Sequence, residues 1–408
     1  MKGVNNLEHK KLELLRKEFP ALSKVHYFNN GTNGPLPRIS YEAMKEEADK
    51  EYYQGRYLPF IKELYEDMDQ TRRLLANILK CSYEEVALTQ STTEAINIVL
   101  WGFKWHPGDE VITTTIDHTS VLAPLALLKS RQGIAVKYIS VEHSERYVEE
   151  NFLKELESQI TNKTKLIVLP HVSFATGMTF PIKEISKICR KYDIQLLVDG
   201  AQGLGALDTD IYDLDVDYYA IAGRKWLLGP EGVGALYIKK NRISNLDPTF
   251  VSPASVKNRH EIDLNSPFYL PAPFAARYHT ATAMYSPILK GFKASLEFMI
   301  DEVGINWATE RIKHLSGYVR SLIEVFPGVQ IVTPKGTEAG FIHFLVKGWN
   351  PVQLSQKLNE KNFMVRPVPK QHAPAPVRIS LGFYLTEDEL NQFSKALEEI
   401  IVNKVMER

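Results

Sequence analysis

Short apolar runs alternate with helical segments between residues 86 and 238, and this alternation predicts parallel strands joined by crossover helices. Each run is short and rich in branched side chains, which is typical of a strand buried on both faces. The predicted strands are 86–89, 111–114, 135–139, 166–169, 194–198, 216–221 and 233–238. Four helices are expected between them. The first begins at Ser91, and the others cover 121–129, 152–160 and 182–192.

The pattern changes on either side of this region. Residues 7–19, 39–53 and 60–79 have helical spacing, whereas residues 241–273 are rich in Pro, Asn and Ser and are predicted to be irregular. Further helices are predicted at 288–300, 306–325, 352–360 and 387–402, mixed with strands at 329–332, 339–346, 363–365 and 377–380. We therefore expect an α/β protein whose smaller C-terminal domain is α+β.

The length of 408 residues exceeds what one hydrophobic core usually serves. We expect a large domain over residues 31–285 and a small domain over residues 286–408, with residues 1–30 joining the small domain. Lysine plus arginine equals aspartate plus glutamate, 49 each, so no net charge draws the chain to nucleic acid or an anionic membrane.

Composition also favours a cytoplasmic protein and argues against disulfides and metal sites. No apolar run approaches the ~20 residues of a membrane span, and the N-terminus lacks the pattern of a signal peptide. Two cysteines, Cys81 and Cys189, suggest no disulfide framework, so we expect a cytoplasmic protein. The histidines and cysteines show no metal-binding spacing, and no metal site is predicted.

Asp199 and Lys225 are the candidate chemical pair. Each follows a predicted strand, and ligands of open α/β sheets bind at the carboxyl ends of strands. A lysine that forms a Schiff base with an aldehyde, and an acid that faces a pyridine nitrogen, are what pyridoxal phosphate (PLP) requires. The alternative is a turn-capping aspartate and a solvated lysine, each commoner when taken alone.

Two further stretches have both a structural and a functional interpretation. The hydroxyls of Ser91, Thr92 and Thr93 cap a predicted helix, and the free amides at such a helix start also bind phosphate. The turn-rich stretch 27–35 includes Asn30 and Gly31. Its glycines allow backbone to approach a ligand, although a plain loop is the more frequent explanation.

With these motifs in order, the chain resembles the class V aminotransferases. The motifs are Asp199-Gly200-Ala201-Gln202, Gly223-Arg224-Lys225-Trp226 and Gly229-Pro230 followed by Gly232-Val233-Gly234. The family includes cysteine desulfurases, cysteine/cystine C–S lyases and isopenicillin-epimerase-like proteins. The resemblance implies a PLP-dependent transferase of fold type I, in which the large domain holds a mostly parallel seven-stranded sheet.

The resemblance also implies roles for individual residues. Lys225 would hold PLP and move protons, Asp199 would pair with the pyridinium nitrogen, and Gln202 would reach the phenolic oxygen of the ring. His118 would stack on the ring and is counted with Lys225 and Asp199 as catalytic. Ser91, Thr92 and Thr93 would bind the phosphate.

Other implied roles concern the substrate and a second subunit. Arg378 would bind the substrate carboxylate in a bidentate pair, and Asn30 and Gly31 would contact the substrate. In the family, a glycine–threonine pair from the neighbouring subunit closes the phosphate site. Thr282 matches that threonine, which implies a homodimer with sites at the interface.

The sequence departs from the family pattern at three positions. Ala222 replaces a hydroxyl residue before the lysine, and Arg224 brings a charge that could substitute for it. Phe174 stands where an asparagine is usual, which leaves the phenolic oxygen to Gln202. The glycine of the glycine–threonine pair is Ala281.

The absence of a cysteine before Arg378 limits the reactions that the chain could catalyse. A cysteine desulfurase needs a mobile cysteine shortly before the carboxylate arginine, and residues 363–377 contain none. Loss of the Cα proton to Lys225 then leads to β-elimination, transamination or epimerisation. Similarity of residues 101–109 and 216–220 to C–S lyases favours elimination from a cysteine- or cystine-like amino acid. A non-catalytic protein that keeps the fold for binding is the alternative of another class.

Overall fold

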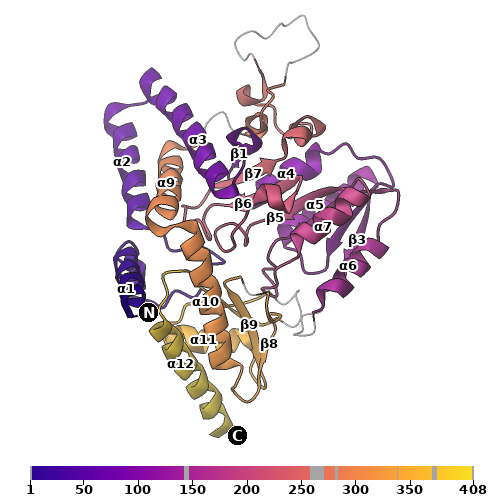
Figure 1. The fold of residues 1–408 in the computed structure, drawn as a ribbon. Helices are drawn as coiled ribbons and strands as arrows, with labels where there is room; N and C mark the ends of the chain where they lie inside the picture. Colours follow the sequence, from indigo (N-terminus) through magenta and orange to yellow (C-terminus); the bar gives the residue numbers. More distant parts are fainter. Residues whose placement is uncertain are drawn as a thin grey trace, which may run out of the picture.

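The computed structural model of this chain describes residues 2–141, 147–257, 271–280, 284–337, 339–369 and 375–406. Its larger sheet has the strand order β1-β7-β6-β5-β4-β2-β3 (Figure 1). Neighbouring strands are parallel except β7, which runs antiparallel to both β1 and β6. The expected mostly parallel sheet of seven strands is confirmed. The strands are Val86–Thr89 (β1), Glu110–Thr114 (β2), Ala135–Ile139 (β3), Thr164–Pro170 (β4), Gln195–Asp199 (β5), Tyr218–Ala222 (β6) and Gly234–Ile238 (β7).

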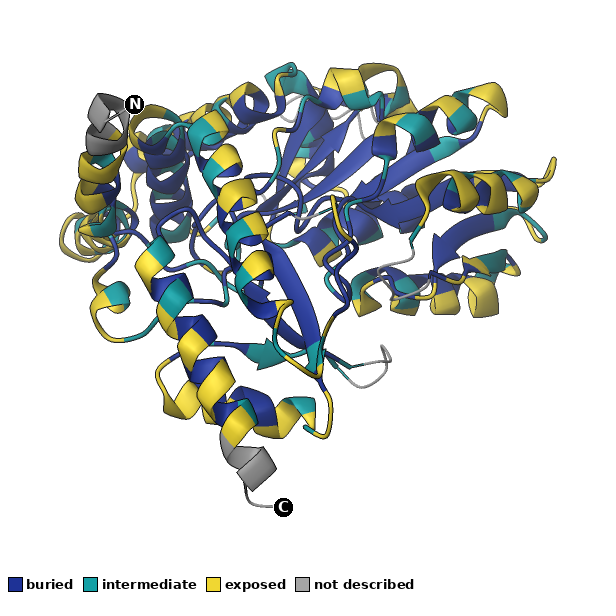
Figure 2. Cartoon of the chain, turned by 60° about the horizontal axis from the view of Figure 1, so that its bottom comes forward, coloured by how far each residue is buried: buried dark blue, intermediate teal, exposed yellow. Residues whose placement is uncertain are grey.

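Helices cover both faces of this sheet because successive side chains of a strand point to opposite sides. In β4, Leu166 and Val168 join the core that also contains α4 and α5, whereas Ile167 and Leu169 join the core that contains α6 and α7. Burial on both faces explains why the sequence shows continuous apolar runs rather than alternation (Figure 2). The helices are α4 (Thr92–Gly102), α5 (Thr119–Gln132), α6 (Glu149–Ser158), α7 (Ile182–Lys191) and the short α8 (Ile211–Leu214).

A second, antiparallel sheet has the order β10-β11-β9-β8. Its strands are Val329–Ile331 (β8), Phe341–Val346 (β9), Arg366–Pro367 (β10) and Val377–Ser380 (β11). The helices α1 (Lys2–Arg16), α10 (Ile305–Ile323), α11 (Pro351–Glu360) and α12 (Glu387–Met406) accompany it (Figure 1). The predicted strand at 363–365 is wrong. Phe363 makes only an isolated bridge to His26, and sheet pairing begins where Arg366 lies opposite Arg378.

Along the helical stretch 286–303, the buried side chains change from the core of the large sheet to that of the second sheet between residues 297 and 298. Helix α9 (Ser286–Glu297) packs against α2 (Arg38–Gln54) and α3 (Leu58–Leu79), and its Leu289 and Phe292 belong to the core of the large sheet. The π-helix that follows, Phe298–Val303, contributes Phe298 and Met299 to the core of the second sheet. The domain boundaries stay predictions, and this packing favours a second unit that begins after α9 rather than at residue 286.

Short 3-10 helices complete the described chain. They are Pro20–Ser23, Tyr83–Glu85, Lys240–Asn245, Pro253–Ser255 and Ala275–Tyr278. The segment predicted to be irregular after residue 241 therefore contains two of these turns. Over the described residues, no helix is both long enough and apolar enough to cross a bilayer.

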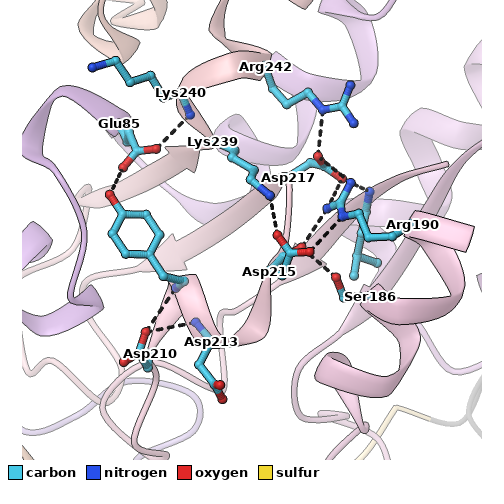
Figure 3. Close-up of polar contacts among 12 residues, drawn as sticks. Glu85, Ser186, Arg190, Asp210, Asp213, Asp215, Asp217, Lys239, Lys240 and Arg242 are labelled. Atoms are coloured by element: carbon cyan, nitrogen blue, oxygen red, sulfur yellow. Dashed lines mark hydrogen bonds and ion pairs between the residues drawn. The ribbon is translucent and has the colours of Figure 1, made fainter. Parts of the chain in front are cut away.

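A buried ion-pair network joins the starts of β5 and β6, at the end of the sheet opposite Asp199 (Figure 3). Asp217 is fully buried, pairs with Arg190 and Arg242, and accepts a hydrogen bond from the amide of Leu196. Asp215 pairs with Arg190 as well. The network therefore fixes α7 and the segment after β7 to the two central strands.

Replacing Asp217 by alanine should destabilise the protein by about 3 kcal/mol, because Arg242 loses its carboxylate partner and the buried amide of Leu196 loses its acceptor. Arg190 loses one of its two carboxylates and keeps Asp215. Urea unfolding of the native chain and of Asp217→Ala measures the difference. Asp208→Ala is the matched control. Its pair with Lys80 is about half exposed on both sides, so a change of no more than about 0.5 kcal/mol is expected. Equal effects of the two variants would contradict a stabilising role of the buried network.

Candidate active site

A cavity lies at the carboxyl ends of the central strands. Asp199 ends β5 and Ala222 ends β6, while Val233 enters the same edge because β7 runs antiparallel to its neighbours. Crossover topology brings strand ends together in this way although they are far apart in sequence. The cavity is lined by Ser91, Thr92, Thr93, His118, Ser120, Pro170, Val172, Phe174, Asp199, Ala201, Gln202, Ala222, Arg224, Lys225 and Val233.

Asp199 and Lys225 line the same cavity and act on each other electrostatically. Desolvation inside the protein lowers the pKa of Lys225 to about 7, and the Asp199 carboxylate acts in the opposite direction. The guanidinium groups of Arg378, Arg224 and Arg366 lower this pKa further, in that order. A large fraction of Lys225 is therefore a neutral, nucleophilic amine at pH 7.

Backbone packing holds Asp199 in place. Its Oδ1 accepts a hydrogen bond of 3.0 Å from the amide of Ala201. The next residue, Gly200, lies against the ring of Tyr219, and a Cβ there would come within 2.0 Å of that ring. The hydroxyl of Tyr219 is 2.8 Å from Nδ1 of His171, and this hydrogen bond fixes the ring against which Gly200 packs. Only glycine lets the turn that carries Asp199 lie so close to β6.

The start of α4 and His118 share a chain of polar contacts. Ser91 caps α4 by accepting a hydrogen bond from the amide of Glu94, and Thr93 Oγ1 lies 2.9 Å from Ser120 Oγ. Ser120 Oγ in turn lies 2.7 Å from Nδ1 of His118, and Nδ1 also accepts from the amide of Ser120. Desolvation lowers the pKa of His118, so its ring is neutral at pH 7.

Ser120 is a wall residue that sequence reasoning did not assign, whereas Phe174 lines the wall as the residue that stands where the family usually has an asparagine. Ser120 was recoverable from its position two residues after a helix-capping histidine, a spacing that lets the amide meet the ring. The ring of Phe174 stands edge-on to His118, with centroids 4.9 Å apart. Phe174 therefore buttresses the histidine and offers the cavity no amide donor.

Gln202 and Arg224 line the cavity but already have partners. Gln202 Oε1 accepts from the indole of Trp226, and Gln202 Nε2 donates to the carbonyl of Gly31. Arg224 pairs with Glu231 and donates from Nε to Asn33. The charge of Arg224 is thus partly compensated on the outer side of the cavity.

The loop that carries Asn30 and Gly31 crosses from the second sheet to the lysine turn. The amide of Gly31 donates to Ser380 Oγ, and Oδ1 of Asn30 accepts from Tyr384. Further along, Gly34 donates to the carbonyl of Arg224, and a Cβ on Gly34 would come within 2.4 Å of the Lys225 carbonyl oxygen. The polar groups of Asn30 and Gly31 are thus bonded within the protein, and their substrate contact stays a prediction.

Two arginines contact the same residue of this loop, Thr32. Arg366 and Arg378 lie opposite each other in β10 and β11, and both donate to Oγ1 of Thr32. Arg378 is buried, its Nε has no partner among the described residues, and desolvation lowers its pKa to about 9. Strand pairing turns the half-buried Arg366 to the same side of the sheet as Arg378.

Thr282, the residue expected to complete the phosphate site of a second subunit, lies outside the described residues, as does Ala281. The nearest described residue before them is Thr280, whose hydroxyl donates to Glu94 in the first turn of α4. Thr280 therefore contacts the same helix start that carries Thr92 and Thr93.

The residues present fit PLP. A partly neutral amine for the aldehyde, a buried carboxylate for the pyridine nitrogen and a capped helix start for the phosphate lie around one cavity. The unpartnered Nε of Arg378 adds a buried donor that has no compensation within the described chain.

Comparison with known proteins gives the same assignment. The profile of the family described as aminotransferase class-V matches residues 26–393. The chain belongs to the aminotransferase class-V family. It is therefore a PLP-dependent enzyme of fold type I.

Relatives and solved structures cover nearly the whole chain. A cysteine desulfurase of Synechococcus elongatus is 26% identical over 95% of this chain, which spans 63% of that protein. A probable cysteine desulfurase of Methanothermobacter thermautotrophicus is also 26% identical, and 98% of its length is matched. An isopenicillin N epimerase of Streptomyces clavuligerus is 26% identical over 91% of this chain and 94% of its own length.

Two structures of the enzyme C-DES are similar to this fold. One is a mutant with glycine covalently linked to the PLP cofactor, with a TM-score of 0.86, 27% identity and coverage of 94% of this chain and 99% of that chain. The other is a complex of this cystine C–S lyase with its reaction product, cysteine persulfide. It has a TM-score of 0.85, 28% identity and coverage of 93% and 99%.

Acetylation of the PLP-free protein with acetic anhydride should modify Lys225 with a pH midpoint near 7, because only the neutral amine reacts. Arg378→Gln should raise this midpoint by removing a cation, and Asp199→Asn should lower it by removing an anion. Peptide mapping by mass spectrometry across pH 5–11 measures the profile. Lys290 is the internal control, since carboxylates of Asp67 and Glu63 outweigh desolvation and raise its pKa to about 12. A Lys225 midpoint above pH 9 would contradict the desolvated amine.

Proposed function

We propose that this enzyme catalyses β-elimination from a cysteine- or cystine-like amino acid and releases pyruvate, ammonia and a sulfur product. The Cα–H and Cβ–S bonds break, sulfur leaves with the bonding electron pair, and water converts the three-carbon remainder into pyruvate and ammonia. Bound PLP supplies an aldehyde for the substrate amino group and an electron-withdrawing ring. Similarity to a cystine C–S lyase supports this reaction.

The chain's own residues have separate tasks in this proposal. Lys225 holds the cofactor and, once released, takes the Cα proton, a task suited to a pKa near 7. Asp199 keeps the pyridine nitrogen protonated. His118 packs against the ring as a neutral imidazole, and Gln202 donates to the phenolic oxygen.

Different residues would hold the cofactor phosphate and the substrate carboxylate. Ser91, Thr92 and Thr93 offer hydroxyls and the amides of a helix start to the phosphate. Arg224 contributes positive charge to the cavity wall. Arg378 binds the α-carboxylate in a bidentate pair, and Asn30 and Gly31 act by fixing the loop beside it.

The observation that carries the choice of substrate is the convergence of Arg366 and Arg378 on one hydroxyl. The α-carboxylate of a substrate occupies Arg378, which leaves Arg366 with donors for a second negative group. Cystine has a second carboxylate on the far side of its disulfide, whereas cysteine has none. We therefore propose cystine as the better substrate of the two.

Cysteine chemistry supports elimination rather than persulfide transfer to the enzyme. Burial raises the pKa of Cys81 and of Cys189 to about 12, so both thiols stay protonated and unreactive. Neither cysteine lines the cavity, and the chain has no others. These positions support the proposal that no thiol of this chain accepts sulfur during catalysis.

Purified protein loaded with PLP should form pyruvate from cystine with a kcat/KM at least tenfold above that for cysteine. Lys225→Ala should lose the visible absorbance band and at least a thousandfold of the activity, because both the linkage and the proton acceptor disappear. Lactate-dehydrogenase coupling measures pyruvate. Conversion of PLP into pyridoxamine phosphate without pyruvate would indicate transamination, and racemised substrate would indicate epimerisation.

Arg366→Gln separates the substrate choice from the reaction itself. It should raise the KM for cystine about tenfold and leave cysteine and S-methylcysteine nearly unchanged, since only cystine carries the second carboxylate. Lys104→Gln, at an exposed surface pair with Asp247, is the control. A uniform loss on all three substrates would contradict a subsite specific for the second carboxylate.

We also propose a homodimer in which Thr282 completes the phosphate site of the neighbouring subunit. Four large side chains at the turn between α2 and α3, Tyr52, Tyr53, Tyr57 and Leu58, are more than half exposed. Clustered apolar exposure of this kind marks an interaction surface, which a second copy would cover.

Light scattering should give a molar mass twice that of one chain. A Tyr52→Glu, Leu58→Glu double variant should shift the mass toward the monomer, because buried unpaired carboxylates oppose association. A monomeric mass for active native enzyme would contradict the shared site.

A further inference from the structure

Two buried neighbours fix the orientation of the Gln202 side chain. Its oxygen accepts a hydrogen bond of 2.9 Å from Nε1 of Trp226, and its nitrogen donates one of 2.9 Å to the carbonyl of Gly31. An indole can only donate and a carbonyl can only accept. A flipped amide would therefore lose both hydrogen bonds at once, so the two neighbours select a single orientation.

Trp226 is held firmly enough to impose this selection. Its side chain is almost fully buried, and its ring lies edge-on to Phe341 with centroids 5.6 Å apart. On another side, a Cβ on Gly340 would come within 2.4 Å of the indole, so the backbone packs directly against it. Gly31 is anchored separately, because its amide donates to Ser380 in β11.

The remaining capacity of Gln202 toward the cavity follows from these contacts. One of the two N–H groups is used by Gly31, and the amide nitrogen keeps a second N–H. Among the described residues that line the cavity, Gln202 carries the one side-chain amide, and Phe174 offers no donor. The orientation of the Gln202 amide therefore matters for the cofactor. If the NH2 end faces the phenolic oxygen, it donates a hydrogen bond; if the C=O end faces it, the two oxygens repel each other.

We propose that Trp226 is a positioning residue that makes Gln202 present an N–H to the phenolic oxygen of PLP. This inference rests on the proposed contact between Gln202 and the cofactor. A donor at that oxygen stabilises its negative charge, which favours loss of the proton shared between the cofactor and Lys225. Trp226 thereby tunes the pH at which the bound cofactor changes its absorbance, although the indole lies behind the cavity wall.

Trp226→Phe keeps an aromatic ring against Phe341 but removes the N–H. The pH midpoint of the visible absorbance change of the holoenzyme should rise by about one unit, the size expected for a hydrogen bond to a charged oxygen. Trp101→Phe is the matched control, since the Trp101 indole also donates to a side-chain amide, Asn97 Oδ1 at 3.0 Å. The control should leave the midpoint unchanged. No shift with Trp226→Phe, or an equal shift with Trp101→Phe, would overturn the inference.

A double-mutant comparison separates this role from a general packing effect. Gln202→Ala should raise the midpoint by itself, and adding Trp226→Phe should produce no further shift. An additional shift of the same size would show that Trp226 acts independently of Gln202. If Gln202→Ala leaves the midpoint unchanged, the proposed cofactor contact of Gln202 fails, and the inference falls with it.

A second replacement covers the case in which Trp226→Phe does not fold. Benzothienylalanine at position 226 has nearly the shape of tryptophan and carries sulfur in place of the N–H. It should reproduce the upward shift with an unchanged thermal unfolding midpoint of the PLP-free protein. An unshifted absorbance midpoint in this folded variant would overturn the inference as well.

Discussion

The active site depends on placing one amine and one carboxylate in a water-poor cavity at the ends of two adjacent strands. In water, solvation of the ammonium group would keep the pKa of Lys225 near its ordinary value of 10.5. Desolvation in the protein lowers this pKa to about 7. Asp199 opposes this shift but does not cancel it. The protein thus obtains a nucleophile at neutral pH from burial, and the surrounding arginines reinforce the effect.

The loop at residues 26–34 connects the parts of the site. It bridges to Phe363 and to Ser380 of β11, and it donates to the carbonyl of Arg224 beside the lysine. Gly31 and Gly34 make these approaches possible, since a Cβ at either position would overlap a neighbouring group. Arg378, the proposed substrate-binding residue, and Lys225, the proposed cofactor-binding residue, are therefore linked through one continuous stretch of backbone.

Positive charge is distributed unevenly around the cavity. Arg224 has carboxylate and amide partners, while Arg366 and Arg378 share a single neutral hydroxyl. Two cations that meet without an anion cost free energy, and an anionic substrate relieves that cost. Among the described residues no anion compensates these two arginines, so we expect the carboxylates of the proposed substrate to gain most from binding beside them.

Local pattern was sufficient for much of this protein. The strand at 194–198, the position of Asp199 at its end and the lysine after β6 follow from short apolar runs that break at glycine, and burial on both faces makes such runs unmistakable. The predicted strand at 363–365 failed because three apolar residues do not show which backbone they will pair with.

Contacts between distant residues were decided only by the tertiary structure. Gln202 and Gly31 are 171 positions apart, and Arg378 and Thr32 are 346 apart, so no local period records them. The side toward which Arg366 points depends on its register against Arg378, and the core that α9 joins depends on α2 and α3. Sequence determined which elements form and which chemical groups they carry, whereas packing determined which groups face one another.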